Sequence, residues 1–312
     1  MNNIKNIGEK RNSDGKDLIF IFFGGGMKGV FSAGVVTTME NLNLYDRVHS
    51  IYAVSAGAHD AAFFLAKETQ IGSTIYYEDL LDGGKFINNN RSKFYKSFIL
   101  NSIKKEDKFE KLMDIDYLMD IEKNKKILNI EKISESKIPF SIRLFNCQTR
   151  REEWVDGKTD IFKKLQAAAA VIPFYPSRVE INGVAYFDGD TLSEIIDPVL
   201  EKVINDNPDK KIFIVLNTSK ENRFSMLSLV EDILWTILLL IFVKQTYILR
   251  KLNIFREKRR LEKYCKLPNV KIIDPDFDVS EFCIDKDEEM KLYRNGVKKT
   301  EKIMAENGIK NF

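Results

Sequence analysis

The feature that most constrains the fold is an uninterrupted apolar hexapeptide, Leu18 to Phe23 (LIFIFF). Its residues do not alternate between apolar and polar, so the strand that it predicts must be covered on both faces, as in a parallel α/β sheet. Three glycines follow, and a helical pattern then runs from Lys28 to about Leu42 with apolar residues along one face. This order of strand, tight turn and helix is typical of α/β proteins.

The same order repeats directly downstream. A second apolar strand at Val48 to Val54 turns sharply at Ser55 and continues into a helix over 58–67. Two successive units of this kind favour a parallel sheet with right-handed crossovers. Further strands are expected at 140–146, 153–155, 179–187 (a hairpin through Asn182-Gly183) and 211–217. The sequence therefore predicts a three-layer α/β/α fold with a mainly parallel central sheet and a helical C-terminal appendage.

Charge and cysteine content exclude several classes of protein. Lys and Arg number 49 against 46 Asp and Glu, a net charge of +3 that does not suggest a nucleic-acid binder. Cys147, Cys265 and Cys283 are scattered and lack metal-ligand spacing. We therefore expect no disulfide framework and no metal site, and a reducing compartment such as the cytoplasm fits.

A strongly apolar helix is expected at 225–249, followed by a basic stretch. The longest near-continuous apolar run, Ile233 to Val243, is shorter than the roughly 20 residues that cross a bilayer. Residues 244–266 hold nine Lys or Arg and two Glu, a local net charge of +7. Three interpretations stay open: a core helix of the appendage, a lid over a site, or a peripheral membrane contact made by 225–266.

The glycine run Gly24-Gly25-Gly26 directly follows the first strand and opens a helix. Glycines let the backbone turn tightly and approach a ligand closely, and N–H groups at a helix start can face an anion. The string matches the G-x-G-x-x-G pattern of dinucleotide-binding proteins, but it equally suits an oxyanion hole for acyl transfer. Alone, it also fits a plain tight turn.

The next strand-to-helix turn favours acyl transfer. A dinucleotide-binding fold would normally place an acidic residue near the end of the second strand. Here that strand ends in Ala53-Val54-Ser55-Ala56-Gly57, a nucleophile elbow with alanine where the first glycine of G-x-S-x-G usually stands. Ser55 is therefore the candidate nucleophile.

A serine nucleophile needs a base, and the chain has only two histidines. His59 lies along the helix that follows Ser55, and His49 precedes the second strand, so both are interpreted as structural. Asp188 ends an aromatic strand in an Asp-Gly turn, where apolar walls would raise its pKa and make it a better base near neutrality. An ordinary turn is the alternative.

Four ordered elements together resemble the patatin-like phospholipase family, in particular its bacterial members with a C-terminal extension. They are the GGGMKG string at 24–29, the AVSAG elbow at 53–57, the small-residue helix and proline turn at 167–176, and Asp188-Gly189. The resemblance spans about residues 17–220. It divides the chain into a flexible leader at 1–16, a catalytic domain at 17–220 and a helical extension at 221–312 packed on it.

The resemblance implies a Ser55/Asp188 dyad that works without histidine. It assigns the oxyanion hole to Gly24, Gly25 and Gly26 and puts Lys28 at the family's Arg/Lys position, where it would bind an anionic substrate or hold the loop; an exposed helix lysine is the alternative. Two positions depart from the family pattern. Ala53 replaces a glycine, which is tolerable if its φ is not positive, and Asp190 replaces a small residue, where a second carboxylate would raise the pKa of the base.

Together these observations predict a serine acyl-ester hydrolase that acts on lipid or lipid-like esters. The chemistry requires no cofactor, and no calcium-loop motif is present. The expected location is the cytoplasm, with peripheral contact at a membrane. A non-catalytic relative that binds acyl chains or a protein partner stays open, as does a nucleotide-binding α/β protein.

Overall fold

The computed structural model describes residues 15–88, 93–94, 96, 111–172, 174–175, 177–190, 195–223 and 254–309. Within these residues, eight strands form one sheet in the order β5-β6-β3-β2-β1-β7-β8, with β4 paired to β3. The strands are β1 (Leu18–Phe22), β2 (Val48–Val54), β3 (Phe140–Asn146), β4 (Arg151–Asp156), β5 (Val179–Ile181), β6 (Val184–Asp188), β7 (Lys211–Val215) and β8 (Val270–Ile273).

The centre of the sheet is parallel. β3, β2, β1, β7 and β8 run in the same direction, whereas β4 and β6 pair with β3 in the antiparallel sense. β5 and β6 form the expected hairpin, and both turn residues, Asn182 and Gly183, have positive φ. That pair of angles is typical of the tight two-residue turn that Asn-Gly predicts.

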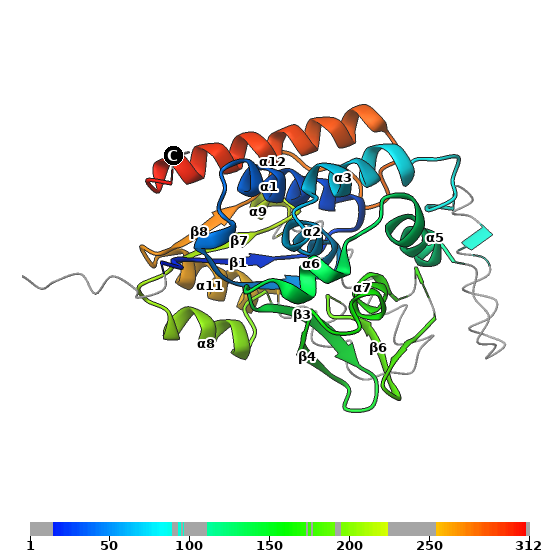
Figure 1. Cartoon of the computed structure of the whole chain (residues 1–312), viewed down its shortest axis with the longest axis horizontal. Coiled ribbons are helices and arrows are strands. Elements are labelled where there is room, and N and C mark those ends of the chain that lie inside the picture. The colour runs from blue at the N-terminus through cyan, green and yellow to red at the C-terminus, as the bar shows by residue number, and fades with distance from the viewer. Residues whose placement is uncertain are drawn as a thin grey trace, which may run out of the picture.

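Helices cover both faces of the sheet (Figure 1). The α-helices are α1 (Val30–Asn41), α2 (Ala56–Leu65), α3 (Thr69–Thr74), α5 (Ile115–Asp120), α6 (Ile130–Glu135), α7 (Ile161–Ala169), α8 (Pro198–Asp206), α9 (Lys220–Arg223), α11 (Ile254–Cys265) and α12 (Lys286–Glu306). Short 3₁₀ helices occur at η1 (Gly26–Gly29) and η2 (Tyr45–Arg47), and π-helical turns at η3 (Ile75–Asp79) and η4 (Ile121–Lys125). In Figure 1, α1 and α12 lie on one side of β1, and α8 and α11 lie on the other.

The first strand explains why the fold has three layers. Leu18, Phe20 and Phe22 of β1 face a core that they share with α1 and α2. The intervening Ile19 and Ile21, with the following Phe23, face a second core that they share with α8 and α11. Because side chains alternate between the two faces of a strand, an all-apolar strand has to be buried on both sides. The predicted α/β/α architecture is thus confirmed.

The sequence predicts a helical C-terminal appendage, but this region also contains a strand. β8 lies beside β7 in parallel register, with Ile214 opposite Ile272, and so extends the central sheet. It is only four residues long, and its two inner residues are only partly buried, so it gives a weak strand signal in the sequence. α12 crosses α1 closely, because a Cβ at Gly34 would lie 2.4 Å from the Tyr293 carbonyl oxygen and a Cβ at Gly296 2.2 Å from that of Phe31.

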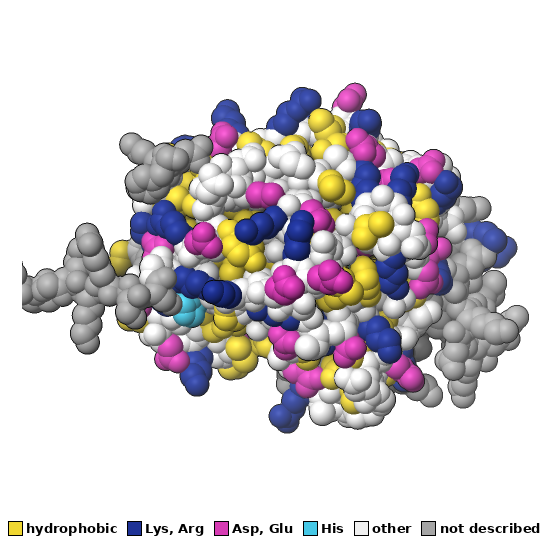
Figure 2. All heavy atoms as spheres, in the orientation of Figure 1, with side chains coloured by type: hydrophobic (Ala, Val, Ile, Leu, Met, Phe, Trp, Pro, Cys, Tyr) yellow, Lys and Arg dark blue, Asp and Glu magenta, His cyan; other side chains and the backbone are white. Residues whose placement is uncertain are grey.

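The strongly apolar helix predicted at 225–249 lies outside the described residues. Part of the basic stretch that follows it belongs to α11, where Arg260 donates a hydrogen bond to the Ile196 carbonyl. No helix in the described part of the chain is long and apolar enough to cross a membrane. On the face in Figure 2, basic and acidic side chains are intermixed.

Candidate active site

Sheet register brings the glycine loop and the serine turn together. Phe22 at the end of β1 pairs with Ala53 near the end of β2, so the loop after β1 lies beside the turn after β2. A Cβ placed on Gly24 would be 2.6 Å from the Ser55 Cβ and 3.0 Å from its Oγ. Only glycine fits at such a separation. The carboxyl ends of parallel strands are also where α/β proteins usually bind ligands.

Ser55 occupies a strained turn between β2 and α2. Its φ of 54° and ψ of −133° are unusual for a residue with a side chain, and it is 5 % exposed. Gly57 permits the turn, since a Cβ there would lie 2.7 Å from the Phe22 Cβ. Ala53 is an ordinary strand residue and is absent from the residues with positive φ, so its methyl group is accommodated.

Asp188 reaches Ser55 across the end of β3. Val54 of β2 pairs with Arg143 of β3, and the next β3 residue, Leu144, pairs with Asp188 at the end of β6. The Asp188 carboxyl is fully buried, and the neighbouring Ser55 hydroxyl lowers its pKa as a hydrogen-bonding group. The carboxyl accepts a hydrogen bond from the backbone N–H of Asp190 at 2.8 Å. Two residues 133 positions apart in the chain therefore meet at one point.

The environment of Asp188 raises its pKa to about 8. Burial is the largest cause, because desolvation disfavours the charged carboxylate, and the nearby Asp190 carboxylate adds to it. The hydrogen bond from Ser55 and the positive charge of Arg143 act in the opposite direction. A carboxyl that titrates near neutrality is suited to accept and return a proton.

Arg143 is a member of this cluster that the sequence analysis missed. It is fully buried in β3, and its Nη2 lies 4.0 Å from Oδ1 of Asp190. Its Nη1 donates to Asp197 at 3.4 Å. The guanidinium also lies over the rings of Phe23 and Trp154, 5.7 and 5.6 Å from their centres. It supplies a counter-charge for the carboxylates behind the site.

The glycine loop is anchored on both sides, and the N–H groups of its glycines are not used by these anchors. The Asn217 side chain, just after β7, donates to the Phe23 carbonyl at 2.7 Å and accepts from the Ser32 N–H at 3.0 Å. The Met27 N–H donates to the Glu281 carbonyl at 3.1 Å. Among the described residues, no acceptor is bonded to the N–H of Gly25 or Gly26. These two groups are therefore available to a ligand anion.

Ser55 and Gly26 open onto a pocket of about 730 Å³, counting the part that faces solvent. Its walls are mostly apolar and include Phe63, Ile75, Leu80, Met113, Leu118 and Phe174. A pocket of this size and lining is typical of sites for small apolar ligands. Its wall combines the helix behind Ser55 with η3 and α5.

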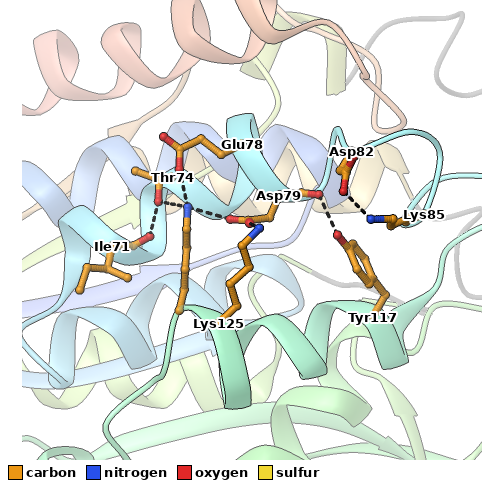
Figure 3. A network of polar contacts seen from close by, with 9 residues as sticks. Ile71, Thr74, Glu78, Asp79, Asp82, Lys85, Tyr117 and Lys125 are labelled. Carbon is orange, nitrogen blue, oxygen red and sulfur yellow. Dashed lines mark hydrogen bonds and ion pairs between the residues drawn. The ribbon is translucent and has the colours of Figure 1, made fainter.

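Ion pairs fasten one wall of this pocket (Figure 3). The nearly fully buried Asp79 in η3 pairs with Lys125 of η4 at 2.6 Å and with the adjacent Lys126 at 2.7 Å. Lys126 also contacts Glu78 at 2.6 Å. η3 and η4 both contribute residues to the pocket, so this network links two parts of its wall.

Comparison with known proteins then identifies the family. The model for patatin-like phospholipases matches residues 20–197, which is more than half of the chain. The chain belongs to the patatin-like phospholipase family. The crystal structure of VipD from Legionella pneumophila is similar at 12 % identity and a TM-score of 0.48, covering 93 % of this chain and 67 % of that one. The comparison with curated proteins finds no match.

Membership in the patatin-like family supports lipid acyl hydrolase activity and a lipid substrate. The family match ends at residue 197, whereas the predicted catalytic domain runs to residue 220. β7 lies beyond the match but pairs with β1, and Asn217 follows its last residue by two positions. The boundaries at 16 and 220 remain predictions.

The structure brings together most of the predicted site residues. Ser55 lies against Gly24 and lowers the pKa of the neighbouring Asp188, and Gly25 and Gly26 continue the loop. Lys28 faces elsewhere: its Nζ lies 3.4 Å from the Thr218 hydroxyl and 3.9 Å from a Glu281 carboxylate oxygen. These contacts fit the loop-holding alternative, and substrate binding by Lys28 remains a prediction.

Both histidines lie where a structural role would put them. The His49 ring lies 3.3 Å from the Ser50 hydroxyl in β2. His59 is buried, with its ring nitrogens 2.6 Å from Glu122 and 3.2 Å from the Leu165 carbonyl oxygen. In the described part of the chain, no group of three or more His, Cys, Asp and Glu could hold a metal ion.

Proposed function

We propose that this patatin-like protein is a serine acyl-ester hydrolase in which Ser55 is the nucleophile and Asp188 the general base. The observation that carries the proposal is that the Ser55 hydroxyl is a hydrogen-bonding neighbour of a buried carboxyl whose pKa is raised to about 8. A nucleophile in contact with a base of matched pKa is the minimal arrangement for covalent catalysis. The strained serine turn and the adjacent glycine loop support it.

In the first half of the reaction, ionised Asp188 takes the proton from the Ser55 hydroxyl as its oxygen attacks the ester carbonyl carbon. The carbonyl oxygen becomes an oxyanion, which accepts hydrogen bonds from the N–H groups of Gly25 and Gly26, with Gly24 beside them. When the intermediate collapses, the bond between the carbonyl carbon and the alcohol oxygen breaks. Asp188 then returns the proton to the departing alcohol.

In the second half, water attacks the acyl-serine and gives a proton to Asp188. The second tetrahedral intermediate is held by the same N–H groups, and its collapse releases the carboxylic acid. The proton on Asp188 goes back to the Ser55 oxygen. Each proton is therefore taken and returned by one carboxyl group, and no histidine, metal or cofactor is needed.

The apolar pocket beside Ser55 supports a lipid or lipid-like acyl ester as the substrate. Peripheral contact with a membrane through 225–266, and a cytoplasmic location, complete the proposal. The +7 charge of residues 244–266 supports attraction to anionic lipid. Vesicle co-sedimentation with and without anionic lipid tests the membrane contact, which is refuted if neither vesicle type binds the protein.

The catalytic proposal is tested with Ser55→Ala and a matched control, Ser134→Ala, which removes the hydroxyl of an exposed serine on α6. Wild type and Ser134→Ala should hydrolyse p-nitrophenyl acyl esters and react with a serine-directed phosphonate probe. Ser55→Ala should do neither. Substantial hydrolysis by purified Ser55→Ala would reject the nucleophile. Absence of hydrolysis and labelling in the wild type would instead favour a non-catalytic relative.

A further inference from the structure

The pocket contains a buried polar cluster within its apolar wall. His59, Asp60, Tyr76 and Glu122 line it together with the apolar side chains. Polar groups in such a place need partners, because a buried donor or acceptor without one is destabilising. Identifying the partner of each polar group therefore shows which atoms remain for a ligand to hydrogen-bond.

The carboxyl group of Asp60 is hydrogen-bonded by other side chains of the protein. The Tyr76 hydroxyl donates to its Oδ1 at 3.2 Å, and the Ser32 hydroxyl contacts its Oδ2. Both carboxyl oxygens thus have a partner. Asp60 therefore has no evident need of a ligand.

His59 is likewise fully engaged. Its Nε2 must donate to the Leu165 carbonyl, which can only accept, and its Nδ1 donates to the Glu122 Oε1 at 2.6 Å. Two donating nitrogens describe an imidazolium ion. Although burial opposes it, the Glu122 carboxylate raises the pKa of His59, in agreement with this charge state.

Glu122 is the exception. Its residue is 1 % exposed, yet its Oε2 has no hydrogen-bond partner among the described residues. The other oxygen is bound by His59, which also supplies the positive counter-charge. The His59–Glu122 pair still lacks one hydrogen bond, to Oε2 of Glu122. Because the positive charge of His59 already balances the carboxylate, a neutral donor can supply this bond. A hydroxyl group meets that need, whereas a bare methylene chain does not.

Resting on the proposed function, we infer that the pocket is specific for acyl chains that carry a hydroxyl group, which donates its hydrogen bond to Oε2 of Glu122. His59 follows Ser55 by four residues on α2, about 6 Å along the helix axis. The hydroxyl group is therefore expected along the chain and not beside the ester carbonyl. Glu122 acts here as a specificity residue and His59 as its positioning residue.

The test uses pairs of p-nitrophenyl esters with equal chain length, one plain and one with a hydroxyl group at successive positions along the chain. For the wild type, kcat/KM should be about tenfold higher for the hydroxylated ester at one position, since a site built to bind a hydroxyl discriminates against its absence. In Glu122→Leu, which is apolar, this ratio should fall below one. Glu122→Gln keeps an acceptor oxygen and should give an intermediate ratio.

Phe63→Leu is the matched control, because it alters an apolar wall residue of the same pocket. It should change the rates for both esters by similar factors and preserve their ratio. Thermal melting of every variant shows whether it is folded, and Glu122→Gln keeps the test decisive if Glu122→Leu is not. Wild type that hydrolyses plain and hydroxylated esters equally at all positions would overturn the inference while leaving the proposed function intact. Failure to hydrolyse any ester would refute the proposed function itself.

Discussion

Nη2 of Arg143 lies 4.0 Å from Oδ1 of Asp190, so a fully buried guanidinium balances the carboxylate that departs from the family pattern. Asp190 is also the second cause of the raised pKa of Asp188, after burial. The arginine therefore limits a like-charge repulsion that would otherwise keep the proposed base protonated. This relationship explains how an extra acid is accommodated two residues from Asp188.

Replacing Asp190 by Asn should move the pH dependence of catalysis. For the wild type, kcat/KM should rise with pH around the Asp188 pKa of about 8, because only the ionised form is a base. Removing the neighbouring negative charge makes that ionised form less costly, so the rise should shift to lower pH. Burial should still hold the midpoint above the ordinary value of 3.8. The measurement is the pH profile of kcat/KM.

Asp206→Asn is the control for that experiment, since it removes the same charge from an exposed position on α8. Its pH profile should match the wild type. If Asp190→Asn also leaves the profile in place, Asp190 does not act on the base.

Asp188→Asn should stabilise the protein more at high pH than at low pH. The folded state holds a proton on Asp188 up to a pH of about 8, whereas the unfolded chain releases it near 3.8. Raising the pH through this window therefore favours unfolding of the wild type, and asparagine carries no such penalty. Thermal melts of both proteins across the window should show a widening difference in Tm. A constant difference would contradict the raised pKa.

Gly24→Ala should impair catalysis without unfolding the sheet. The added methyl group would lie 2.6 Å from the Ser55 Cβ and 2.9 Å from Oδ2 of Asp190, so the serine must move. A displacement on the order of 1 Å near reacting groups lowers the rate by about 10²-fold. We expect a loss of that size in kcat, with far-ultraviolet circular dichroism unchanged. Gly15→Ala strains a backbone with a φ of 68° but places its Cβ within 4 Å of no atom, so it should retain full activity.

Asp79→Asn should loosen the wall that η3 and η4 build. Asp79 is 1 % exposed and forms ion pairs with both Lys125 and Lys126. The substitution therefore leaves two ammonium groups without their common carboxylate partner. The free energy of unfolding should fall by about 1–3 kcal/mol. Denaturant unfolding measures this. Lys125→Ala removes only the exposed partner and should cost less; an equal or larger loss would assign the stability to Lys125.

The fold was predictable where burial dictates the residue pattern. β1 and β7 are nearly continuous apolar runs because helices cover both of their faces, and β2 and β3 keep enough apolar residues to be recognised as strands. The serine turn was predictable too, because a strained φ at Ser55 requires small neighbours, and those are visible in the sequence. β8 was missed because a four-residue strand at the sheet's edge carries too little pattern.

The remaining parts of the site depend on pairings between distant segments. Arg143 stands alone in an apolar strand, and nothing near it in the sequence indicates the acids that neutralise it. The same holds for His59, whose partner Glu122 is 63 residues away. Asn217 is the last residue of the strand predicted at 211–217, but its hydrogen bond to the Phe23 carbonyl depends on the tertiary fold.

The bond between the Met27 N–H and the Glu281 carbonyl has a consequence for biosynthesis. Glu281 leaves the ribosome long after residues 20–197, which the family model covers, have emerged. During synthesis, the chain therefore contains Ser55 and Asp188 before the hydrogen bond between Met27 and Glu281 can form. We expect the proposed activity only once this late segment has docked, so that an incomplete chain would remain inactive.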